Sequence, residues 1–70
     1  MLDVDAIAQI IRTGANVRLS SKCTLPAEHL IQLAAMAREN NAILEIQGNL
    51  PVDSLVAIAR AGGIHVSIAL

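Results

Sequence analysis

The chain contains the same short segment three times. Residues 2–14 align with residues 50–62 without a gap, and residues 25–33 repeat the opening of both segments. Self-similarity at a spacing of roughly 20 to 50 residues is typical of stacked units, each of which buries its apolar face on a neighbour. The repeat therefore predicts a single domain of three equivalent units, which span about residues 1–21, 22–48 and 49–70.

Each copy opens with residues that favour the start of a helix. Pro26 and Pro51 fit the first helical position, where a missing N–H loses no intrahelical hydrogen bond. Asp5, Glu28 and Asp53 place a carboxylate in the first turn of each copy, near unpaired amides and the positive end of the helix dipole. Apolar residues then recur with a helical period. The predicted helices span residues 3–13, 26–39 and 51–61.

A short alternating run follows each predicted helix. Apolar and polar side chains alternate along residues 16–20, 42–47 and 64–69, which predicts strands with one apolar face. Strands separated by helices form a parallel sheet through right-handed crossovers. The expected fold class is α/β: a two-layer repeat with a three-stranded parallel sheet in the order 1-2-3 and three helices on one face. The other face of the sheet is expected to be uncovered.

The core must be built from small aliphatic side chains. Hydrophobic residues make up 54% of the chain, and none of them is Phe, Trp or Tyr. The repeat places Ile10, Leu33 and Ile58 at matched helical positions, so all three are expected in the core. Beneath them the predicted strands contribute further core residues, which are Leu19, Ile46 and either Val66 or Ile68.

The second strand and its exit resemble a known repeat family. Residues 44–49 read Leu-Glu-Ile-Gln-Gly-Asn, which is similar to the L-x-L-x-x-N core of leucine-rich repeats. The first unit departs from that pattern, since Lys22 stands where the family has the asparagine that bonds along the inner turn. The resemblance implies a short solenoid of strand–helix units, and recognition of proteins through the open strand face.

Composition argues against several classes of function. The net charge is −1 and the chain has no aromatic residue to stack on a base, so a nucleic-acid partner is not expected. Cys23 is the only cysteine, which excludes a disulfide within the chain. The apolar stretches are far shorter than the roughly 20 residues of a membrane span, and the start is acidic rather than basic. A cytoplasmic protein with no membrane association is expected.

The sequence offers no convincing catalytic site. Cys23, Glu28 and His29 are close in sequence and could in principle form a thiolate–histidine pair, but no second base or oxyanion donor can be named. His65 is expected on the outward face of the third strand, as a solvated or interfacial residue near Glu45. The pair Gly62–Gly63 follows a helix and indicates a helix stop rather than a phosphate loop. We expect no enzymatic activity, cofactor, metal or small-molecule substrate.

The remaining features indicate a protein partner. Arg18, Glu45 and Ser67 are expected in one row across the open sheet face, with Ser20, Gln47 and Ala69 in the next. The third strand has no charge, proline or internal glycine, although natural edge strands usually carry such a block to pairing. We therefore expect an assembly module, most simply a homo-oligomer that associates through the third strand's edge, the uncovered face, or both. The alternative is an immunity or antitoxin-type protein that masks a specific protein target. The expected interface residues are Arg18, Ile43, Glu45, Gln47, His65, Val66, Ser67 and Ile68.

Overall fold

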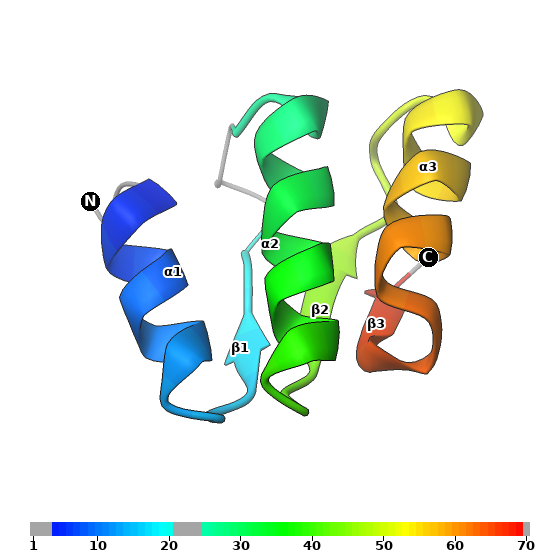
Figure 1. Cartoon of the computed structure of the whole chain (residues 1–70). Helices are drawn as coiled ribbons and strands as arrows, with labels where there is room; N and C mark the ends of the chain where they lie inside the picture. Colours follow the sequence, from blue (N-terminus) through cyan, green and yellow to red (C-terminus); the bar gives the residue numbers. More distant parts are fainter. Residues whose placement is uncertain (1–3, 21–24, 70) are drawn as a thin grey trace.

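The chain folds into a layer of helices over a small sheet. A computed structural model describes residues 4–20 and 25–69 (Figure 1). Helices and strands alternate along these ranges. In chain order the elements are α1 (Val4–Arg12), β1 (Val17–Arg18), α2 (Ala27–Glu39), β2 (Leu44–Gln47), α3 (Val52–Gly62), the 3-10 helix η1 (Gly63–His65) and β3 (Val66–Ala69).

The three strands form a parallel sheet in the order β1-β2-β3. All three helices lie side by side on one face of it, with α2 between α1 and α3 (Figure 1). No described element covers the opposite face. The predicted α/β class, strand order and placement of the helices are confirmed.

The repeated prolines stand just outside their helices. Pro26 and Pro51 are N-cap residues, one position before the first helical residue, whereas the sequence predicted each of them at the first helical position itself. Their carbonyls accept the first helical hydrogen bonds, from the N–H of Leu30 at 3.2 Å and of Leu55 at 3.1 Å. Neither proline has an N–H to leave unpaired at this position, which is why the same residue suits both helix starts.

A residue with a positive φ follows the end of each of the three helices. Gly14 has a φ of 87° after α1, Asn41 has a φ of 56° after α2, and Gly63 has a φ of 57° after α3. Glycine and asparagine are the residues that tolerate this conformation best. These stops turn the chain back beneath the helices towards the sheet.

The core lies between the helices and the sheet. It is aliphatic throughout, and the predicted core positions Leu19, Leu33, Ile46 and Ile58 are buried. Val66 and Ile68 are half-buried and pack against this cluster. The buried apolar residues are Ile7, Ala8, Ile11, Leu19, Leu30, Leu33, Ala34, Ala37, Ala42, Leu44, Ile46 and Ile58.

The prediction that Ile10 belongs to the core is wrong. Its side chain is 38% exposed, whereas the matched residues Leu33 and Ile58 are fully buried. Those two residues lie on the helix flank that meets the preceding helix. No described helix lies on the corresponding flank of α1, so Ile10 has nothing to pack against there.

The third strand begins later than predicted. Ile64 and His65 belong to η1, and the strand starts at Val66. The positive φ of Gly63 redirects the chain, and the N–H of Val66 donates to the Gly63 carbonyl, which closes a tight turn. Ile64 is consequently 90% exposed instead of pointing into the core.

The first two strands are also shorter than predicted. β1 comprises Val17 and Arg18 alone, although the N–H of Leu19 still donates to the Glu45 carbonyl at 2.9 Å. Ala42 lies before β2 because its N–H donates to the carbonyl of Ala37, at the end of α2. The alternating pattern of the sequence thus extends beyond the paired residues on both strands.

The resemblance to leucine-rich repeats is wrong. It required Asn49 to bond along an inner turn, but Asn49 is exposed. The described residues form a small α/β fold with a three-stranded parallel sheet and show no solenoid closure. The similarity of residues 44–49 reflects a buried strand followed by a polar turn.

None of the helices within residues 4–20 and 25–69 combines the length and hydrophobicity needed to cross a bilayer.

Candidate interaction surface

The open face of the sheet carries the predicted row of polar side chains. The strand register pairs Arg18 with Glu45, and Glu45 with Ser67. Gln47 pairs with Ala69 in the next row, whereas Ser20 lies beyond the end of β1 and has no partner in the register. These residues alternate with the buried Leu44 and Ile46 side chains and therefore face away from the helices.

An ion pair joins β1 to β2 on this face. Nε of Arg18 lies 2.5 Å from Oε2 of Glu45. The Arg18 side chain is largely exposed and that of Glu45 is half-buried, so solvent screens their attraction. Exposed pairs of this kind contribute about 0.2–1 kcal/mol to stability. The pair holds two opposite charges beside each other on the open face, which remains polar.

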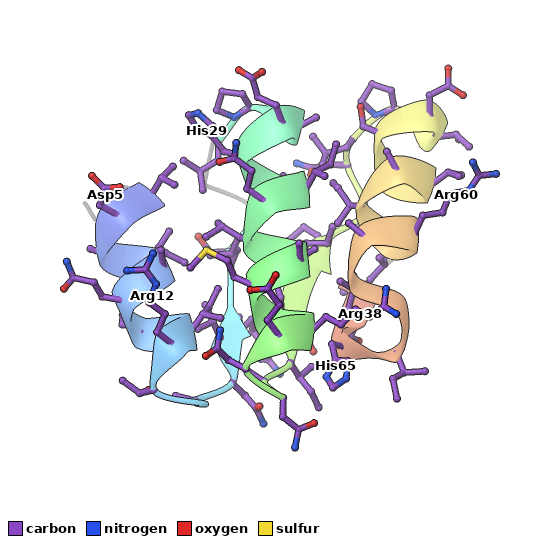
Figure 2. The ribbon with its side chains drawn as sticks, in the orientation of Figure 1. Asp5, Arg12, His29, Arg38, Arg60 and His65 are labelled. Atoms are coloured by element: carbon purple, nitrogen blue, oxygen red, sulfur yellow. The ribbon has the colours of Figure 1, made fainter. Side chains whose placement is uncertain are left out.

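Two of the expected interface residues, Ile43 and His65, lie outside the strands. Oδ1 of Asn16 accepts a hydrogen bond from the N–H of Ile43 at 3.1 Å, and the Ile43 side chain is exposed. His65 instead stands in η1, where its Nδ1 lies 2.9 Å from the Ala42 carbonyl (Figure 2). The register gives Ser67, not His65, as the neighbour of Glu45. The prediction of an outward His65 on the third strand is therefore wrong.

Val66 and Ile68 contribute to the edge of the sheet rather than to its open face. Their side chains are half-buried and point towards the helices. The N–H of Gly48 donates to the Ala69 carbonyl at 2.8 Å, so the backbone of Ala69 faces β2. Backbone groups of alternate strand residues point to opposite edges. The N–H and C=O of Ile68 therefore point outward, towards no described strand.

The two edges of the sheet differ in their protection. At the β1 edge, the N–H groups of Val17 and Leu19 donate to carbonyls on the β2 side, so the outward backbone belongs to the charged Arg18. That strand is also only two residues long. β3 has four residues and no charged side chain. Short length and charge discourage the pairing of another strand, so the β3 edge is the open one.

The candidate catalytic residues form no site that the structure describes. Cys23 lies outside the described residues. Glu28 is exposed in the first turn of α2, and Nδ1 of the neighbouring His29 is buried with no hydrogen-bond partner in the described part of the chain. Among those same residues, no three His, Cys, Asp or Glu side chains come together as metal ligands.

One apolar surface, on the outer flank of α3, was not predicted from the sequence. Val52 and Val56 are 72% and 43% exposed, and the strongly exposed Ile64 follows in η1. The sequence repeat points to this flank, because the matched residues of α1 and α2 pack against a neighbouring helix.

Comparison of the chain with protein-family models, curated proteins and solved structures finds no match to any of them.

Proposed function

We propose that this chain is a small protein–protein interaction or assembly module without enzymatic activity. It associates with a second copy of itself through the β3 edge, the uncovered sheet face, or both. The β3 edge carries this proposal: a four-residue uncharged strand presents the outward N–H and C=O of Ile68 beside half-buried aliphatic side chains. An edge of this kind is a template for another strand.

The uncovered face supports the same function. Purely parallel sheets are normally covered on both faces. Here the side chains opposite the helices are a mixture of polar, small and charged groups, in which the Arg18–Glu45 pair lies beside Ser67. Such a surface is polar enough to be stable in water, and no described element covers it, so a second protein surface can reach it.

The edge is tested by removing one backbone donor. A synthetic chain with N-methyl-isoleucine at Ile68 keeps the side chain but loses the outward N–H. The matched control carries N-methyl-arginine at Arg18, which removes the outward N–H of the other edge. We expect sedimentation equilibrium to show a dimer for the parent and the control, and a monomer for the variant at Ile68.

The open face is tested separately by Ala69→Arg, which adds a long charged side chain beside Gln47. Ala15→Arg, at an exposed turn, is its control. Loss of the dimer in the Ala69 variant alone assigns the contact to the face. A parent chain that remains monomeric would refute self-association and favour a role in masking a different protein.

A further inference from the structure

The helices use one flank to pack on the helix that follows in the chain. In α1 this flank consists of Val4, Ala8 and Ile11, of which the last two are buried. The repeat matches these residues with Ala27, Ile31 and Ala34 of α2. Ala34 is buried, and a methyl group placed on Gly62 of α3 would lie 3.2 Å from its Cβ. The flank of α2 therefore contacts α3.

The matched flank of α3 has no neighbour in the described structure. It consists of Val52, Val56 and Ala59, at the same positions of the repeat. Val56 is 43% exposed, although its counterparts Ala8 and Ile31 are buried or packed against the core. Val52 is 72% exposed, although its counterpart Val4 packs against the core. This flank is apolar, like the flanks by which α1 and α2 contact the next helix, but no described helix packs against it.

Two opposite charges border the flank. Asp53 lies in the first turn of α3 and Arg60 in the last, and both side chains are exposed. They are seven residues apart, so they lie on the same side of the helix but about 10 Å apart along it. Arg60 projects from α3 on the side away from α2 (Figure 2). At this separation the two residues cannot pair within one helix.

We propose that two copies of the chain meet through an antiparallel pair of α3 helices, in which Asp53 of each copy faces Arg60 of the other. This inference rests on the self-association proposed above and specifies how the second copy is held. In this dimer a two-fold axis perpendicular to the sheet relates the two copies. Rotation about that axis reverses the direction of α3 and leaves the helices of both copies on the same side of the dimer. Each Asp53 is then beside an Arg60 of the partner, and Val56 lies at the centre of the contact.

The same axis also brings the β3 edges together. Gly62, the last residue of α3, packs against Val66, the first residue of β3. Val56 is six residues from Gly62, about 9 Å along the helix. Ile68 is two residues from Val66, about 7 Å along the strand. Val56 and Ile68 therefore lie at similar heights, and one two-fold axis passes close to both.

The charges disfavour the other simple arrangement, in which copies stack head to tail. That arrangement would place α3 beside a parallel α1 of the next copy. The repeat matches Asp5 with Asp53 and Arg12 with Arg60. Parallel stacking would therefore set like charges beside each other at both ends of the contact, whereas the antiparallel pair sets opposite charges together.

Charge reversal tests the antiparallel pair. Asp53→Arg or Arg60→Asp should each weaken self-association by about tenfold, because two attractive contacts become repulsive. Mixing the two variants in equal amounts should restore the affinity of the parent, since a mixed dimer again pairs opposite charges at both contacts. Sedimentation velocity over a concentration series measures the association of the parent, of each variant and of the mixture.

Asp5→Arg and Arg12→Asp are the matched controls. Both positions are exposed and occupy the same places in α1, so they have the same local effect on a helix but lie away from the proposed contact. A parent monomer would refute self-association altogether. A parent dimer whose four variants behave alike would refute the α3 pair alone. Stronger association of the Asp53 variant would overturn it in favour of head-to-tail stacking.

Discussion

Gly62 allows α3, α2 and β3 to approach one another. A methyl group at this position would collide with Cγ2 of Val66 and lie 3.2 Å from Cβ of Ala34. Val66 is β-branched and cannot rotate away easily. We expect Gly62→Ala to destabilise the fold by about 1–3 kcal/mol, since overpacking outweighs the better helix propensity of alanine. Urea unfolding measures this loss.

The double variant Gly62→Ala with Val66→Ala is the control for that interpretation. It removes the colliding methyl group, so its stability loss should be smaller than the sum of the two single losses. Strict additivity would show that the approach of Gly62 to Val66 is not the cause.

Ile46 occupies the centre of the sheet and is 2% exposed. Ile46→Ala should lower the free energy of unfolding by about 2–5 kcal/mol through lost burial and a residual cavity. Ile43→Ala is the matched control, because Ile43 precedes the same strand but is exposed. Its loss should stay below about 1 kcal/mol. Equal thermal midpoints for the two variants would contradict the assignment of Ile46 to the core.

At the residue level, the sequence predicts burial well where the repeat has neighbours on both sides. Leu33 and Ile46 belong to the central helix and strand, and both were predicted correctly. Ile10 was not, because helical periodicity gives the direction of a side chain but not the presence of a helix beside it. Ile64 continues an alternating apolar pattern, yet the left-handed Gly63 before it starts a tight turn instead of a strand.

At the level of elements, the Arg18–Glu45 pair joins the shortest strand to the sheet. A double-mutant cycle with Arg18→Ala and Glu45→Ala should give a coupling energy of about 0.2–1 kcal/mol, because both side chains contact solvent. About 1 M salt should reduce this coupling, since the Debye length falls to about 3 Å. A coupling that is unchanged by salt would show that the contact is not electrostatic.

The helices were easier to predict than the strands. Pro26 and Pro51 mark two helix starts within one residue, because proline lacks the donor that a helix interior needs. Strand limits depend on hydrogen bonds to a neighbouring chain segment, which alternation does not encode. The turn at Gly63 delays β3, because it places Ile64 and His65 in η1 instead of beside β2.

At the level of the whole molecule, the repeat predicts the order of the strands. The rows across them follow from the alternation along each strand and from the strand register, which places Arg18, Glu45 and Ser67 in one row. The exposed flank of α3 follows from the same repeat. It becomes apparent only when exposure is compared among the three helices, which requires the structure.

Self-association is the central claim, and sedimentation equilibrium of the unmodified chain at micromolar concentrations tests it most directly. The open β3 edge and the exposed α3 flank predict a reversible dimer whose mass returns to that of the monomer on dilution. The variant methylated at Ile68 should remain monomeric over the same range. A clean monomer of the unmodified chain at every concentration would contradict the account.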